Sequence, residues 1–96
     1  MNAFAGPVEP IRCPECYAKG QNAQEDCENN IAFEDCKINE VCAVGSFKKD
    51  DGFEFHRGCV AKNEYNQYKA YCKANEGSCA VAMCKEPNCR PELPVS

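Results

Sequence analysis

The chain has 96 residues and a formal net charge of −4, and 27% of its residues are charged. This length predicts one domain. The two signs of charge are mixed along the chain with no block of five like charges, which argues against a general nucleic-acid or anionic-membrane surface. No segment has the roughly 18 apolar residues that a membrane-spanning helix needs.

The ten cysteines stand out against a composition that is poor in large apolar side chains, with Leu93 as its one leucine and no tryptophan. A chain this small with so few such side chains cannot easily offset the entropy cost of ordering by burial alone. An even and high cysteine count in a short chain is typical of a disulfide scaffold, which forms in an oxidising compartment. We therefore expect an extracellular protein, either secreted or anchored at the cell surface.

The ends of the chain predict tails around one domain. We expect a flexible N-terminal tail at residues 1–9, a domain at 10–90 and a C-terminal tail at 91–96. The start lacks the basic residues and the apolar stretch of a signal peptide, so we interpret Met1 as an expression start and expect that a signal peptide was removed. The sequence has no Asn-x-Ser/Thr sequon, and N-glycosylation is not expected.

The first third of the chain predicts short strands separated by a loop. Residues 11–13 can form a strand, which Pro14 is expected to end because proline has no N–H to donate. The polar stretch at 19–26 predicts a loop that Cys27 closes. Residues 31–33 predict a second short strand.

The middle of the chain, residues 36–59, predicts a long hairpin. Its two apolar runs flank Asp51-Gly52, a dipeptide that tolerates the positive φ angles of a two-residue hairpin turn. A turn at these two residues sets Lys49 opposite Glu54, which adds a few tenths of a kcal/mol. An isolated hairpin is marginal in water, so we expect its cysteines to fix its base.

Residues 63–72 have the composition of a helix, with Asn63 as its expected N-cap. Tyr65, Tyr68 and Cys72 recur on one helical face, which we interpret as the packing face. After this helix, the apolar run at 80–83 predicts a buried strand.

Sequence alone leaves the disulfide pairing open, because ten cysteines allow on the order of 900 pairings. Cys84 and Cys89 enclose four residues and can close a small loop. Bridges that close longer loops constrain the unfolded chain more.

The order of the cysteines resembles that of the lymphocyte antigen six/urokinase receptor (LU) family, which has the three-finger fold. The likeness covers roughly residues 11–90 and depends on cysteine order and short motifs. The matching segments are residues 11–17, 40–44, 57–59 and 84–89. The resemblance implies a small, disulfide-rich and mainly β three-finger fold, here with a short helix near residues 63–72.

The resemblance also implies which cysteines pair. Finger one would be residues 17–26 and finger two residues 43–58. The short spacing between the seventh and eighth cysteines, and Arg90 in place of the family's asparagine, resemble divergent invertebrate members. The implied disulfides are Cys13–Cys42, Cys16–Cys27, Cys36–Cys59, Cys72–Cys79 and Cys84–Cys89.

Metal and redox chemistry are the main alternatives for the cysteines. Cys13-Pro-Glu-Cys16 also looks like a zinc knuckle, but a tetrahedral zinc site commonly uses two such close pairs. The remaining candidates, Cys79, Cys84 and Cys89, are spaced too loosely for a second knuckle. A Cys-x-x-Cys redox site would need a βαβ context that the sequence does not suggest. We expect no metal and no cofactor.

We also expect no catalytic residues and no enzymatic activity. His56 is the one imidazole, and the chain has three serines and no threonine, so a Ser/His/Asp arrangement is hard to assemble. His56 is expected on the exposed face of a strand. Residues 50–51 lack the ladder of oxygen ligands of a calcium loop and are expected in a solvated turn.

The hairpin tip predicts a partner-binding surface, because aromatic residues and arginine are the usual anchors of protein interfaces. Alternation along a strand sets Phe53, Phe55 and Arg57 on one face and Glu54 and His56 on the other. The first set either covers the sheet's own face or contacts a partner. The predicted partner-binding residues are Phe47, Lys48, Lys49, Phe53, Phe55 and Arg57.

The function expected from this resemblance is that of a non-enzymatic extracellular protein-binding module. It would engage a receptor, channel or cell-surface protein through finger two. Many members of the family carry a glycosylphosphatidylinositol (GPI) anchor, so a lipid anchor in the native precursor is compatible with the resemblance. The alternatives are a secreted toxin-like three-finger effector, which the net charge of −4 weakly opposes, and an intracellular zinc-binding interaction domain with reduced thiols.

Overall fold

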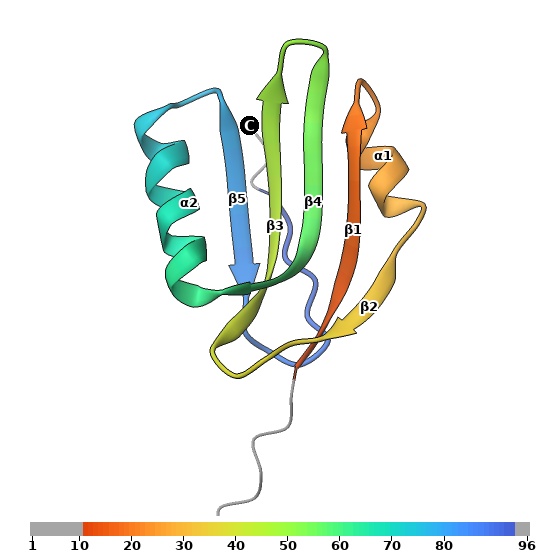
Figure 1. The fold of residues 1–96 in the computed structure, drawn as a ribbon, viewed down its shortest axis with the longest axis vertical. Coiled ribbons are helices and arrows are strands. Elements are labelled where there is room, and N and C mark those ends of the chain that lie inside the picture. Colours follow the sequence, from red (N-terminus) through yellow and green to blue (C-terminus); the bar gives the residue numbers. More distant parts are fainter. Residues whose placement is uncertain (1–10, 94–96) are drawn as a thin grey trace, which may run out of the picture.

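A computed structural model describes residues 11–93, which form a five-stranded antiparallel sheet with two helices (Figure 1). The strand order is β2-β1-β4-β3-β5, and five disulfides join the elements. The predicted disulfide-rich, mainly β architecture with a short helix is confirmed, whereas the tail expected at 1–9 lies outside the described residues. In chain order the elements are β1 (Arg12–Gly20), α1 (Ala23–Glu28), β2 (Ala32–Asp35), β3 (Glu40–Lys49), β4 (Gly52–Ala61), α2 (Lys62–Ala74) and β5 (Cys79–Cys84).

The first strand continues through Pro14, where it was expected to end. Residues 12–15 pair with β2 and residues 16–20 pair with β4, so β1 changes its partner just after the proline. Pro14 therefore lies in the short ladder at the edge of the sheet, where a missing N–H is tolerated.

A helix, α1, occupies the second half of the stretch at 19–26 that was expected to be a loop, and β1 extends into its first two residues. Ala23 and Cys27 are four residues apart on one helical face, and both are 1% exposed. Cys27 is also bonded to Cys16 in β1. The loop prediction was wrong because tertiary burial and this bridge hold a short helix whose polar sequence has almost no apolar stripe.

The central hairpin forms, but its register differs from the prediction. Lys49 pairs with Gly52, so residues 50–51 make the turn, one position earlier than expected. Phe47 lies opposite Glu54 in place of Lys49. The predicted pairing of Lys49 with Glu54 is therefore wrong.

Gly52 explains this register. It has a φ of 142°, and a Cβ on it would lie 2.4 Å from the carbonyl carbon of Gly20. The tip of the β3–β4 hairpin therefore touches the end of β1 at a position that has no room for a side chain. The glycine is needed for this contact between the two hairpins as well as for its backbone conformation.

The core lies on one face of the sheet, where α1 and the segment after Cys89 cover it. In Figure 1 this last segment runs back behind the strands. Pro91 is buried and Leu93 packs against the core, although both were expected in a C-terminal tail. The buried members of this core are Cys16, Ala23, Cys27, Val44 and Phe55.

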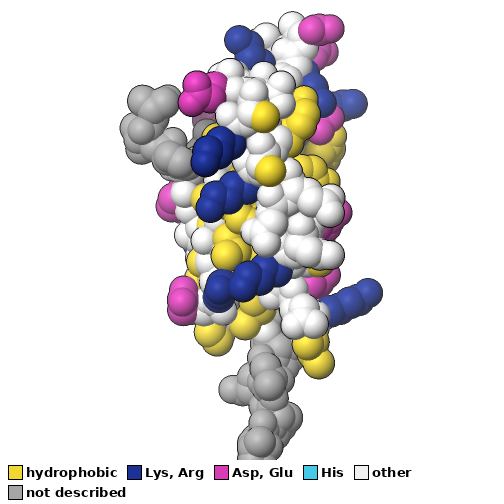
Figure 2. Space-filling view, turned by 90° about the vertical axis from the view of Figure 1, so that its left-hand side faces the viewer, with side chains coloured by type: hydrophobic (Ala, Val, Ile, Leu, Met, Phe, Trp, Pro, Cys, Tyr) yellow, Lys and Arg dark blue, Asp and Glu magenta, His cyan; other side chains and the backbone are white. Residues whose placement is uncertain are grey.

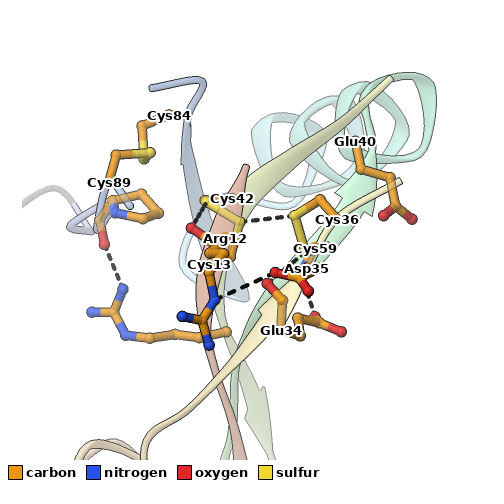
Figure 3. The surroundings of a disulfide bond; sticks show 12 residues. Arg12, Cys13, Glu34, Asp35, Cys36, Glu40, Cys42, Cys59, Cys84 and Cys89 are labelled. Carbon is orange, nitrogen blue, oxygen red and sulfur yellow. Dashed lines mark hydrogen bonds and ion pairs between the residues drawn. A yellow bond between two sulfur atoms is a disulfide. The ribbon is translucent and has the colours of Figure 1, made fainter. Parts of the chain in front are cut away.

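Three of the five bridges gather at one end of the sheet (Figure 3). There the sulfur atoms of Cys13 and Cys36 lie 3.0 Å apart, so their two disulfides are in contact. The disulfides in the structure are the same five pairs that the resemblance implies, namely Cys13–Cys42, Cys16–Cys27, Cys36–Cys59, Cys72–Cys79 and Cys84–Cys89.

The second helix, α2, lies beside β5 and is tied to it by the Cys72–Cys79 bridge (Figure 1). Cys72 and Tyr65 are buried as its packing face. Asn63 is not the N-cap, because the helix begins at Lys62 and has no side-chain cap. Among residues 11–93, no helix is long and apolar enough to cross a membrane.

Candidate binding groove

The face of the sheet opposite the core is open among residues 11–93, apart from α2 along its β5 edge. Here α2 and the strands border a groove of about 550 Å³. Its floor is formed by alternate residues of β3 and β4, because side chains of a strand point to the two faces in turn. The large side chains that line it are Tyr17, Phe47, His56, Tyr65, Tyr68 and Val81.

Two pairs of aromatic rings shape the groove. The rings of Phe47 and Tyr68 lie 5.9 Å apart at 64°, and those of Tyr17 and His56 lie 5.8 Å apart at 85°. Such edge-to-face pairs are each worth about 0.5–1.5 kcal/mol beyond their buried area. Gly45 makes room for the Phe47 ring, since a Cβ there would lie 2.9 Å from that ring's Cε1. The aromatic rings of the groove are therefore held in position by contacts with each other and by the space that Gly45 leaves.

Charged and hydroxyl groups surround this aromatic floor. Lys49, Glu54 and Glu64 line the groove beside the rings. Burial raises the pKa of Tyr65, so its phenol stays neutral at physiological pH and can both donate and accept a hydrogen bond. An apolar centre with a polar border is the anatomy of a protein-binding surface.

Two of the six predicted partner-binding residues, Phe47 and Lys49, line the groove. Lys48 is exposed, but it lies opposite Phe53 and points to the other face of the sheet. The structure also brings Tyr17 from β1 and Tyr68 from α2 to the groove, and sequence reasoning missed both. Their sequence signal was weak, because neither is near the hairpin in the chain.

The other four predicted residues lie on the core face, and the expected exposure of two of them, Phe55 and Arg57, is corrected. Phe55 and Arg57 are each 1% exposed and belong to the packed interior. Phe53 is 41% exposed and lines a different cavity beside α1. Alternation along β4 was predicted correctly, but the residues chosen for binding were those of the buried face. His56 is exposed, as expected, and lies on the open side.

Arg57 joins three separate parts of the chain beneath this face. Its Nε and Nη2 donate to Oε2 of Glu28 in α1 at 2.9 and 2.8 Å. Its Nη1 donates to the carbonyl oxygen of Pro91 at 2.7 Å, and its guanidinium carbon lies 5.7 Å from the centre of the Phe55 ring. Arg90 binds the other carboxylate oxygen of Glu28. The set connects β4, α1 and the final segment.

The carboxyl of Glu28 is expected to make stability depend on pH. Its partial burial alone would raise its pKa, but hydrogen bonds and charges from Arg57 and Arg90 hold the pKa below its ordinary value of 4.5. A carboxyl with a lowered folded pKa adds stability above the unfolded pKa, and this stability is lost as pH falls through the folded value. Melting temperature should therefore drop below about pH 4.5, and Glu28→Gln should flatten that drop.

The control for this titration is Glu25→Gln, which changes an exposed residue of the same helix. It should keep the pH profile of the unchanged protein. Identical profiles for Glu28→Gln and the unchanged protein would show that the Glu28 ion pairs contribute nothing to acid sensitivity.

The sulfur atoms form two close groups, Cys13 with Cys36 and Cys59, and Cys42 with Cys84 and Cys89. All of these sulfurs are in disulfides, and the structure has no free cysteine. A disulfide sulfur is not a thiolate, so these groups are packed bridges rather than metal ligand sets.

The chain matches no protein-family model, no curated protein and no solved structure with which it was compared. The resemblance to the LU family therefore depends on the order of the cysteines and on short motifs of the sequence.

Proposed function

We propose that this chain is an extracellular three-finger module of the LU type, without catalytic activity, that binds a protein partner through its open face. Strand order supports the fold. Finger one consists of β1 and β2 with α1 at its tip, and finger two is the hairpin of β3 and β4. In the place of finger three, β5 pairs with β3 and α2 stands where a strand would complete a hairpin.

The extracellular placement is supported by the cysteines. The ten cysteines form five bridges, and the chain has few large apolar side chains to stabilise it otherwise. Bridges of this density persist in an oxidising environment, where small domains depend on them.

The aromatic groove is the one observation that carries the binding function. Phe47 and Tyr68 contact each other on a sheet whose hairpins are tied at their base by disulfides. A surface that is held in place before binding loses less side-chain and backbone entropy when a partner arrives. Tyrosine is among the residues that most often dominate binding energy at interfaces.

The test is binding of the oxidised chain to an array of extracellular receptor and channel domains, measured by surface plasmon resonance. We expect saturable binding to at least one domain, weakened about tenfold or more in a Phe47→Ser and Tyr68→Ser double variant, since central aromatic anchors are each worth about 2 kcal/mol or more.

The control for this test makes the same two substitutions elsewhere on the surface. Phe33 and Tyr71 are 55% and 57% exposed and lie outside the groove. A Phe33→Ser and Tyr71→Ser variant should bind normally. Equal loss in both variants, or a groove variant that binds normally while its melting temperature is unchanged, would contradict the proposal.

A further inference from the structure

A second surface lies on α2, on the flank beside its packing face. Lys62, Lys69 and Lys73 are spaced at i, i+7 and i+11, which places them in one row along the helix. The row is about 16 Å long at 1.5 Å per residue. Lys85, which follows β5 directly, extends it at the N-terminal end of the helix. We call these four exposed lysines the basic stripe.

Lys62 and Lys85 are held close together. Both line a cavity of about 570 Å³ with Asn63 and Asn66, whose side-chain amides can donate hydrogen bonds. The side chain of Lys85 and its positive charge lower the pKa of Lys62. Two ammonium groups this close repel each other, and an anion between them would remove the repulsion.

The start of α2 adds to the same positive field. The helix has 13 residues, and two of its first backbone N–H groups are already bonded: that of Lys62 donates to the carbonyl oxygen of Asn39 at 3.1 Å, and that of Glu64 donates to Oδ1 of Asn63 at 2.9 Å. The contribution of this end to anion binding is therefore that of the helix dipole. Glu40 also lines the cavity with a carboxylate that accepts the backbone N–H of Lys37 at 2.6 Å, so one negative charge lies beside the two lysines.

The charges of the basic stripe are not neutralised within the part of the chain that the structure describes. The ion pairs among residues 11–93 are formed by arginines, and none includes Lys62, Lys69, Lys73 or Lys85. Figure 2 shows the flank that carries α2, where Lys and Arg side chains follow one another along the molecule. Four unpaired charges in a line form a surface for an anionic partner.

We propose that the basic stripe binds a linear sulfated polysaccharide of the cell surface or extracellular matrix. Sulfate groups repeat along such a chain, and a row of ammonium groups matches them better than a single compact cation site does. The choice of a glycan rests on the extracellular placement proposed above. Nucleic acid is not the usual partner there, and the anionic lipids that attract basic segments are concentrated in the cytoplasmic leaflet.

The net charge of −4 does not prevent this binding. At physiological ionic strength the screening length is about 8 Å, so a polyanion at α2 responds mainly to the charges near it. The acidic residues of the β3–β4 turn and of α1 belong to other elements of the fold, whereas Glu64 in α2 and Glu40 in the Lys62 cavity lie beside the stripe, where the four lysines outnumber them. At low salt, where screening is weak, the repulsion from the acidic residues is felt at longer range.

The experiment measures the affinity of the full chain for a heparin oligosaccharide at about 50 and about 200 mM NaCl. We expect affinity to fall with salt, as it does when bound counterions are released, and to be lost with an unsulfated oligosaccharide of the same backbone. A variant with Lys62, Lys69, Lys73 and Lys85 all replaced by glutamine should bind about tenfold or more weakly at the lower salt and show a smaller salt dependence.

The matched control replaces four exposed lysines that lie elsewhere, Lys19, Lys37, Lys48 and Lys49, by glutamine. It changes the net charge equally and should keep its affinity within about twofold, as expected for charges that are outside the row on α2. Equal losses in both variants, or no binding of heparin by the unchanged chain, would overturn the proposal. Binding to vesicles with anionic lipid but not to heparin would overturn the choice of a glycan.

This outcome is separate from that of the protein-binding proposal. The basic stripe and the aromatic groove involve different residues of α2, so the four-lysine variant should retain partner binding. If the unchanged chain binds a protein partner but not heparin, the glycan proposal fails and the protein-binding proposal stands. If it binds heparin but no protein partner, the protein-binding proposal fails and the glycan proposal stands.

Discussion

Replacing Cys13 and Cys42 together by alanine is expected to lower the free energy of unfolding by about 3–4 kcal/mol. The bridge closes a loop with a sequence separation of 29, and both cysteines are 0% exposed. Its removal frees a long segment of the unfolded chain and leaves two small gaps in the packed base. Domains of this size are stabilised by only about 5–15 kcal/mol, so urea denaturation should show a much lower midpoint or no folded state at all.

The Cys84→Ala and Cys89→Ala variant is the internal comparison. This bridge spans a sequence separation of 5, and the loss expected from chain entropy is about 2 kcal/mol. Both variants retain four bridges, so a difference between them reports the loop length and the packing of the base. Equal urea midpoints for the two variants, or a smaller loss of stability without Cys13–Cys42 than without Cys84–Cys89, would contradict this account. Neither loop length nor packing of the base would then set the contribution of a bridge.

The helix and the long hairpin could be predicted because both depend on residues that are close together in the sequence. The spacing of Tyr65, Tyr68 and Cys72 indicated a helix; Tyr65 and Cys72 are buried as predicted, whereas Tyr68 is 43% exposed. The apolar runs around the Asp-Gly dipeptide indicated the long hairpin. The register was missed because Gly52 makes a contact with Gly20, which belongs to another hairpin. Local turn preferences hold no information about that neighbour.

The choice between the two faces of β4 could not be made from sequence. Alternation separates Phe55 and Arg57 from Glu54 and His56, but it does not say which face the rest of the chain covers. Arg57 is buried because Glu28 and Pro91 satisfy its donors, and these lie 29 and 34 residues away in the sequence. An arginine with aromatic neighbours resembles an interface anchor until those partners are known.

The basic stripe was hidden for a similar reason. Along the chain its lysines are separated by tyrosines, a glutamate and amides, so no block of like charge appears. The helix gathers Lys62, Lys69 and Lys73 on one side, and the Cys84–Cys89 loop adds Lys85. Net charge and runs of like charge depend only on the sequence, whereas a partner contacts the folded surface, where residues distant in the sequence lie together.

Arg57→Met should lower the free energy of unfolding by about 3 kcal/mol, because it leaves a carboxylate and a carbonyl oxygen without their donors in a partly buried site. The side chain of Glu28 is 23% exposed, so water can reach part of it and limit the loss. Methionine keeps most of the apolar volume, which separates the charge effect from the cavity effect.

Arg12→Met is the matched control, since Arg12 pairs with Asp35 at 3.3 Å while both side chains are more than half exposed. Its loss should be within about 1 kcal/mol, as for other surface pairs. Comparable losses for the two arginines would contradict the network beneath the groove. Partner binding gives the second readout: if Arg57→Met weakened binding while the melting temperature stayed unchanged, Arg57 would have to reach the surface. With Arg57 1% exposed, we expect instead that any effect on binding follows the fraction of folded protein.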